Sequence, residues 1–294
     1  MVGNVPADNA AALLDQLHSE AIIHTMPCDH GDLVWQQWPV RVAAGLSPAR
    51  EARPLLLLHG GFGSWMHWAA NIPALRQHRE VWTLDMPGLG DSADCPQPHT
   101  PEHIASIVLH GLDTLLGPAT GFELAGFSFG AMVGARLAIL AGSRCSRFTA
   151  IGAAGCGDLH VQVRLQHPPT PDTAPAEARS IHRGNLRALM FASNDSIDDQ
   201  AIHIHGENLA RARFNSRKLS LSGDFIQAMP LIKARLVGVW GSRDATAGGR
   251  SNLEKRRALF AAAQTGAEFH ILDGIGHWAM YEAPDAINKI LLAT

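Results

Sequence analysis

The segment ELAGFSFGAMVG places Ser128 between two glycines, Gly126 and Gly130, where an apolar run meets a run of small residues. This matches the pattern G-x-S-x-G, in which a sharp turn from strand to helix lifts the serine hydroxyl above a sheet. The glycines are expected because side chains would collide where strand and helix close on each other, and because the serine takes a strained conformation. An ordinary helix cap with incidental glycines gives the same letters, so the pattern alone does not decide.

A nucleophilic serine needs a base to take its proton and a group to orient that base. Asp244 follows the apolar run 235–240, and His277 follows the run 268–272, so both side chains are expected at strand ends. The chain order Ser128, Asp244, His277 is the order of this elbow class. We therefore predict that these three residues form a catalytic triad.

Other residues compete for these roles. The chain has sixteen histidines, and most histidines are core or surface residues. Asp158 follows an earlier strand and is a rival to Asp244, while Asp273 is expected only to shape the turn before His277. Asp244 is preferred because WGSRD joins a strand end to a glycine-containing turn that can aim a carboxylate inward.

Acyl transfer also needs N–H donors aimed at the developing oxyanion. The segment HGGFGSW (59–65) directly follows the strand-like run PLLLL, and its glycines would let backbone N–H groups approach a ligand. We predict Gly61 as the first donor, with Phe62 one residue away as the alternative, and the N–H of Phe129 as the second. No G-K-[ST] follows this segment and the G-x-G-x-x-G spacing is absent, which argues against a nucleotide.

Composition restricts the class of protein. The 294 residues are 46% hydrophobic and 17% charged, with a formal net charge of −3, as in a globular protein with no strongly charged partner such as nucleic acid. The N-terminal segment has no secretion-signal pattern, the four cysteines are widely spaced, and PLLLL is too short to span a membrane. We expect a cytoplasmic protein with a small-molecule substrate, no membrane partner and no cofactor, and homo-oligomer formation is left open.

The elements that would position these residues alternate between strands and helices. This pattern predicts an α/β fold with a mostly parallel sheet covered on both faces. The predicted strands are 21–27, 33–40, 54–59, 81–85, 122–126, 148–152, 235–240 and 268–272, the first two antiparallel; the predicted helices are 101–116, 129–141, 252–265 and 284–292. Between residues 155 and 230 no strand pattern recurs, and amphipathic helical spacing replaces it.

Taken together, HGGFGSW, LDMPGLGDSA, GFSFG, WGSRD and GIGHW resemble the motifs of the α/β-hydrolase fold in their order along nearly the whole chain. The resemblance implies a core domain (1–155 and 231–294) with an eight-stranded sheet, and a helical cap (156–230) over the active site. A serine at the nucleophile position speaks against the dehalogenase and epoxide-hydrolase branches.

The stretch 185–214 and the Trp278 that follows the histidine are similar to carbon–carbon hydrolases of aromatic meta-cleavage pathways. That resemblance implies a cap arginine, matched to Arg213, that binds a dienoate carboxylate; a solvated surface charge is the competing interpretation. The chain departs from that group at Phe127, where the group usually has asparagine. Phe62, Phe127 and Trp278 are further candidates for the substrate pocket, although most aromatic residues simply pack. His203 and His205 lie two apart on a predicted helix, so they point to different faces and predict no metal site.

The leading hypothesis is a serine hydrolase acting on a small to medium, largely apolar carboxylic ester. The first alternative is carbon–carbon bond hydrolysis of a meta-cleavage-type keto-dienoate by the same triad. A non-catalytic ligand-binding protein is the second alternative, and it has no chemical need for a triad and an oxyanion loop. Transfer of the acyl group to an alcohol or amine depends on exclusion of water, which no motif reports.

Overall fold

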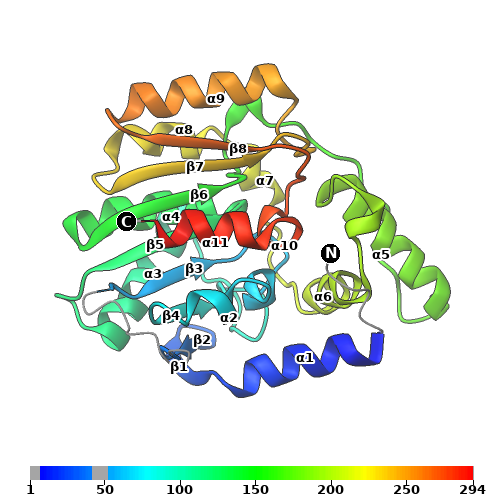
Figure 1. Ribbon diagram of the computed structural model, residues 1–294. Helices are drawn as coiled ribbons and strands as arrows, with labels where there is room; N and C mark the ends of the chain where they lie inside the picture. Colours follow the sequence, from blue (N-terminus) through cyan, green and yellow to red (C-terminus); the bar gives the residue numbers. More distant parts are fainter. Residues whose placement is uncertain (1–6, 42–51, 294) are drawn as a thin grey trace.

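The fold is built on one eight-stranded sheet. The structure, a computed structural model, describes residues 7–41 and 52–293 (Figure 1). The strands are β1 (Ile22–Cys28), β2 (Gly31–Trp38), β3 (Leu55–Leu58), β4 (Val81–Leu84), β5 (Phe122–Phe127), β6 (Cys145–Ile151), β7 (Arg235–Gly241) and β8 (Glu268–Leu272). Their order is β1-β2-β4-β3-β5-β6-β7-β8; β1 and β2 pair antiparallel, β2 is antiparallel to β4, and the remaining pairs are parallel. The predicted α/β fold and its antiparallel start are confirmed.

Helices cover both faces of this sheet. They are α1 (Ala7–Ser19), α2 (Ile72–Leu75), α3 (Pro101–Leu116), α4 (Phe129–Ala141), α5 (Pro175–Leu189), α6 (Asp199–Ala210), α7 (Arg217–Ser220), α8 (Asp224–Ala228), α9 (Arg250–Ala263), α10 (Ala279–Glu282) and α11 (Pro284–Leu292). The 3-10 turns are η1 (Trp65–Trp68), η2 (Gly142–Arg144), η3 (Gly157–Leu159), η4 (Asn194–Ser196) and η5 (Met229–Leu231).

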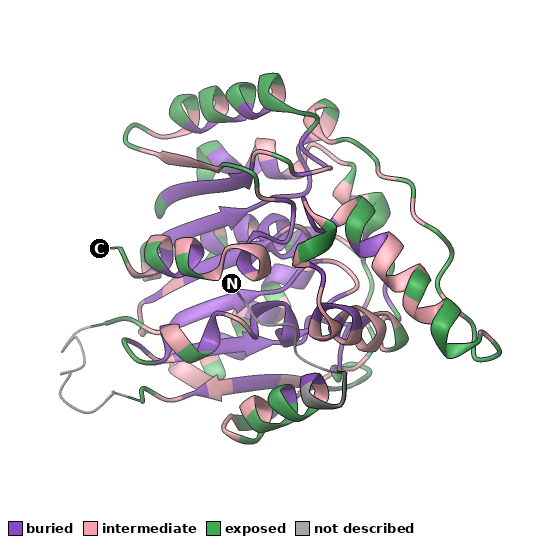
Figure 2. Cartoon of the chain, turned by 45° about the vertical axis from the view of Figure 1, so that its right-hand side comes forward, coloured by how far each residue is buried: buried purple, intermediate pink, exposed green. Residues whose placement is uncertain are grey.

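The run LLLL in β3 shows why the sheet needs cover on both sides. Leu56 and Leu58 pack in one apolar cluster with residues of α3, α4 and α9, and Leu55 and Leu57 pack in a second cluster with α2 and α11. Side chains alternate between the faces of a strand, so a continuous apolar run belongs to a strand buried on both faces. Figure 2 shows the central strands as a buried layer between helices whose outer sides are exposed.

The segment 156–230 leaves the sheet after β6 and returns at β7. It contains helices and turns and no strand, as predicted. Figure 1 shows α5 and α6 beyond the edge of the sheet at which the parallel strands end, and α6 packs against α5 and α1. The end of the segment contacts the helices that cover the sheet. The carboxylate of Asp224 in α8 accepts hydrogen bonds from both Nε and Nη2 of Arg136 in α4.

All eight predicted strands are present, and their ends differ from the predicted ones by at most three residues. The predicted helices 101–116, 129–141 and 284–292 have the observed bounds. The observed helix α9 begins at Arg250 and ends at Ala263, two residues before each end of the predicted helix 252–265. Helix α1 was not predicted. In the described part of the chain, no helix has the length and apolarity needed to cross a membrane.

Candidate active site

Ser128 lies in a strained turn between β5 and α4. Its backbone has φ 51° and ψ −113°, a conformation that non-glycine residues rarely adopt, and its N–H donates to the carbonyl of Ile151 at 2.9 Å. A Cβ on Gly126 would lie 2.5 Å from the carbonyl oxygen of Gly130, and a Cβ on Gly130 would lie 2.6 Å from that of Leu58. The two glycines are therefore required by close backbone approach, as the sequence predicts.

Asp244 and His277 form a buried pair beside this turn. Oδ2 of Asp244, in the loop after β7, lies 2.8 Å from Nδ1 of His277, in the loop after β8, and both side chains are almost fully buried. The rival Asp273 instead accepts a hydrogen bond from the Ser242 hydroxyl at 3.1 Å in the neighbouring turn. Asp158 lies in η3, and it is Asp244 that the structure pairs with His277.

Thr246 fixes the Asp244 carboxylate, a role that sequence reasoning missed. The N–H and the hydroxyl of Thr246 both donate to Oδ1 of Asp244, at 2.8 and 2.7 Å. Burial alone would raise the pKa of this carboxyl, but the His277 ring and the Thr246 donors outweigh burial and hold the pKa below its usual range. Asp244 is therefore an anion whose free oxygen faces Nδ1 of His277.

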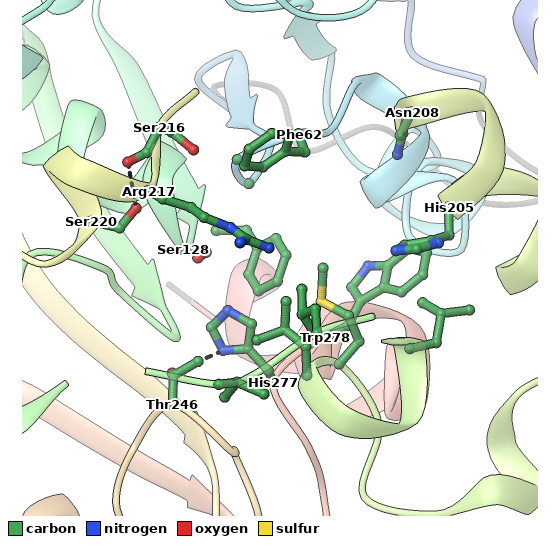
Figure 3. Close-up of a pocket in the computed structure, with 18 of the residues that line it drawn as sticks. Phe62, Ser128, His205, Asn208, Ser216, Arg217, Ser220, Thr246, His277 and Trp278 are labelled. Atoms are coloured by element: carbon green, nitrogen blue, oxygen red, sulfur yellow. Dashed lines mark hydrogen bonds between the residues drawn. The ribbon is translucent and has the colours of Figure 1, made fainter. Parts of the chain in front are cut away.

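The other edge of the imidazole faces Ser128. Figure 3 shows the Ser128 hydroxyl and the His277 ring at the same end of a cavity. One ring nitrogen faces Thr246, and the other is directed toward the serine. With Nδ1 donating to a carboxylate, Nε2 of a neutral ring has a free lone pair. The arrangement can accept a proton from the serine.

The loop 59–65 lies against the start of α4. A Cβ on Gly61 would lie 3.6 Å from Cβ of Phe129 and would collide with the hydroxyl of Ser216. Within the described residues, neither the N–H of Gly61 nor that of Phe129 donates to another protein group. Phe62 has a φ of 53° and its side chain lines the cavity. Two free backbone donors thus lie close together next to Ser128.

The cavity has a volume of about 340 Å³ and a largely apolar wall. Ser128, His277, Phe62, Phe127 and Trp278 line it, together with apolar residues of the segment 156–230 that include Leu186, Leu189, Met190, Leu209 and Leu221. The Phe127 ring packs 4.9 Å from the His277 ring, centroid to centroid. An aromatic side chain before the serine therefore supports the imidazole.

The structure places Arg213 away from this cavity and Arg217 in it. The guanidinium of Arg213 donates to Asp94 at 2.7 Å and to the carbonyl of Gly90 at 3.3 Å, on the surface next to the loop 90–94. Arg217, four residues later, lines the cavity and lies over the Phe62 ring at 5.7 Å. The sequence signal for Arg217 was no stronger than that for its neighbours Arg211 and Arg213.

One histidine of α6 pairs with a histidine of α5. His205 lines the cavity, and its Nδ1 lies 2.9 Å from Nδ1 of His182 of α5. No cluster of three or more His, Cys, Asp or Glu side chains with metal-binding geometry occurs in the parts of the chain that the structure describes, 7–41 and 52–293.

Comparison with known proteins gives the family. A sequence model of the Alpha/beta hydrolase family matches residues 55–290, from β3 to α11, and this range contains Ser128, Asp244 and His277. The chain belongs to the alpha/beta hydrolase family. It is therefore a member of a hydrolase superfamily, and the predicted α/β-hydrolase fold is confirmed.

Individual relatives are distant. The chain is 28% identical to the dihydrolipoyllysine-residue acetyltransferase component of acetoin cleaving system of Pseudomonas putida, over 82% of this chain and 62% of that relative's length. It is 24% identical to the 2-hydroxy-6-oxononadienedioate/2-hydroxy-6-oxononatrienedioate hydrolase of Comamonas testosteroni, over 84% of this chain and 89% of the relative. Among solved structures, a thermophilic esterase from Thermogutta terrifontis shares the fold, with a TM-score of 0.61, 18% identity, and coverage of 92% of this chain and 96% of that one.

Proposed function

We propose that this alpha/beta hydrolase is a serine hydrolase of small to medium, largely apolar carboxylic esters. The observation that carries the proposal is the buried Asp244–His277 pair, 2.8 Å apart, beside the strained Ser128. A buried carboxylate that holds an imidazole proton on Nδ1 has a clear chemical use when the other nitrogen faces a hydroxyl.

The reaction follows from this geometry. Nε2 of His277 takes the hydroxyl proton as Oγ of Ser128 attacks the ester carbonyl, and the N–H groups of Gly61 and Phe129 stabilise the oxyanion. His277 then gives the proton to the departing alkoxide, which leaves an acyl-serine. Water, deprotonated by the same nitrogen, attacks the acyl group, and the proton returns to Ser128 as the acid leaves.

The segment 156–230 is proposed to act as a cap. Its residues Leu186, Leu189, Met190 and Leu209 supply apolar wall to the cavity that contains Ser128. A wall of this kind excludes water and favours an apolar acyl or alcohol group, which supports the ester assignment.

Hydrolysis of phenyl esters of C2 to C8 acids by the wild type and by Ser128→Ala tests the proposal. We expect phenol release by the wild type and a fall in kcat of at least about 10³-fold in the variant. Esters that are not turned over by the folded wild type, or equal rates for the two proteins, would contradict it.

Arg217 favours a second candidate, carbon–carbon bond hydrolysis of a keto-dienoate. Its guanidinium reaches the cavity near Ser128 and has no carboxylate partner within the described residues, so it can bind a substrate carboxylate. For a meta-cleavage product, Arg217→Met is expected to raise KM about 10-fold or more, because a charged hydrogen bond is lost. Arg213→Met, with its arginine outside the cavity, is the matched control. No turnover of the dienoate by enzyme that is active on esters would remove this candidate.

A further inference from the structure

The cavity contains a second set of polar groups, on the wall formed by η1 and α6, which the proposed reaction does not use. The first is the imidazole of His67 in η1, which is buried and lines the cavity. The N–H of Gly60 donates to Nδ1 of this ring at 3.2 Å. A backbone N–H can only donate, so Nδ1 is unprotonated and the proton of the neutral ring is on Nε2.

The ring of His67 is held in place on several sides. It packs edge to face against Phe127 and Trp278, with centroids 5.4 and 5.1 Å away, and the indole N–H of Trp278 donates to the His67 carbonyl at 2.9 Å. Burial, with the neighbouring His59 and His205, keeps the pKa of His67 well below its ordinary value. Nε2–H has no acceptor among the described residues, so His67 is a fixed, uncharged donor.

The second group is the amide of Asn208 in α6, which is 2% exposed and lines the same cavity. Its orientation is set by Ser64. The hydroxyl oxygen of Ser64 accepts the N–H of Met66 at 3.3 Å, and its hydrogen goes to Oδ1 of Asn208 at 2.6 Å. Nδ2 of Asn208 is therefore the end of the amide that points away from Ser64, and this buried nitrogen has no acceptor within the described part of the chain.

Figure 3 shows the Asn208 nitrogen turned toward the middle of the cavity, across from Ser128. His205, three residues earlier on the same helix face, lies beside it. Burial and the nearby His182 lower the pKa of His205 to about 3, so this residue is also uncharged at neutral pH. No Asp or Glu is found among the described residues that line the cavity.

A buried polar group without a partner is costly, and in native proteins it usually has one. Here both residues are linked to Ser64, whose carbonyl accepts the backbone N–H of His67 at 3.1 Å and whose hydroxyl donates to Asn208. Neither Nε2 of His67 nor Nδ2 of Asn208 has an acceptor among the described residues. We infer that His67 and Asn208 form a hydrogen-bonding subsite for an uncharged acceptor oxygen, such as a ketone or amide carbonyl, in the part of the substrate remote from the scissile bond. This inference rests on the proposed function for the identity of the scissile bond.

Matched phenyl esters test the subsite. Phenyl hexanoate is compared with phenyl 4-oxohexanoate and phenyl 5-oxohexanoate, and phenyl heptanoate with phenyl 6-oxoheptanoate, so that a carbonyl replaces one methylene group. For at least one oxo ester, the wild type is expected to show a kcat/KM about 10-fold above that of the parent ester.

Two variants assign the effect to the proposed donors. His67→Asn keeps an acceptor near the position of Nδ1 for the N–H of Gly60 and removes the donor at Nε2, and Asn208→Leu removes the amide. Both should bring the oxo-to-parent ratio close to 1. Asn215→Leu, an asparagine on the Arg217 side of the same cavity, is the control and should keep the wild-type ratio. A purely structural role would lower kcat/KM for both esters equally and leave the ratio unchanged.

The same ratio is then measured as Kd by calorimetry on Ser128→Ala. Tighter binding of an oxo ester without any wild-type turnover would sustain the subsite and overturn only the proposed function. A ratio close to 1 for every pair in turnover and in Kd, or a wild-type ratio retained in both His67→Asn and Asn208→Leu, would overturn the subsite.

Discussion

Replacing Asp244 with asparagine should prevent His277 from acting as a base, while a side chain of the same size still fills the position of Asp244. Thr246 donates two hydrogen bonds to Oδ1, so the amide oxygen of the asparagine stays at that position and its NH₂ faces Nδ1 of His277. Nδ1 then has to accept, and the ring proton moves to Nε2. A ring protonated at Nε2 has no lone pair for the proton of Ser128.

The magnitude follows from what is lost. The wrong tautomer in a triad costs on the order of 10⁴-fold in kcat, or ~5 kcal/mol of transition-state stabilisation. KM should change little, because Asp244 lies behind His277 and is not one of the residues that line the cavity. The folded state loses a charged hydrogen bond, which is about 1.5–3 kcal/mol in the free energy of unfolding.

The assay is phenol release from phenyl hexanoate, with urea denaturation of both proteins as the test of folding. Asp273→Asn is the matched control, since among the described residues this carboxylate accepts only from Ser242 in the adjacent turn, and its kcat should remain within about 2-fold of the wild type. If folded Asp244→Asn keeps more than about a tenth of the wild-type kcat, the role assigned to Asp244 is wrong.

Three further predictions concern stability and pH. Gly130→Ala should lower the free energy of unfolding by about 3 kcal/mol in urea denaturation, because the new Cβ would lie 2.6 Å from the carbonyl oxygen of Leu58. Gly206→Ala, inside α6 with only His182 at an ordinary 3.4 Å, should raise it by about 0.5–1 kcal/mol, and a decrease would contradict the described helix. The difference in unfolding free energy between the wild type and Asp244→Asn should be largest above about pH 4 and shrink as the pH falls through the lowered pKa of Asp244. A difference that grows as the pH falls would contradict a lowered pKa for Asp244.

The repeating part of the fold was predictable because local pattern and burial agree there. The run LLLL in β3 is apolar at every position since both faces of the strand are covered. In the elbow, Gly126 is required by close contact with Gly130 and Ala131, and Gly130 by close contact with the end of β3, which the α/β pattern places beside it. Asp244 and His277 were predictable for a related reason, since parallel strands bring their following loops to one edge of the sheet.

The rest depends on contacts between distant parts of the chain. Arg213 and Arg217 are equally basic in sequence, and only the path of the chain from α6 to α7 decides that Arg217 reaches the cavity. Asn208 gains its importance from Ser64, 144 residues earlier, and a single asparagine in an amphipathic helix gives no local signal for that. Helix α1 was missed because its stability comes from packing against α6 and from the bond between the Trp38 indole and the Leu17 carbonyl.

The most direct test of the central claim is the site and rate of labelling by a fluorophosphonate, read by intact mass and by peptide mapping. The account predicts one label per chain, on Ser128, with no label in Ser128→Ala and labelling slowed by at least about 10³-fold in His277→Gln. If the folded wild type is not labelled at Ser128, or if His277→Gln is labelled as fast as the wild type, then Ser128 is not a nucleophile activated by His277.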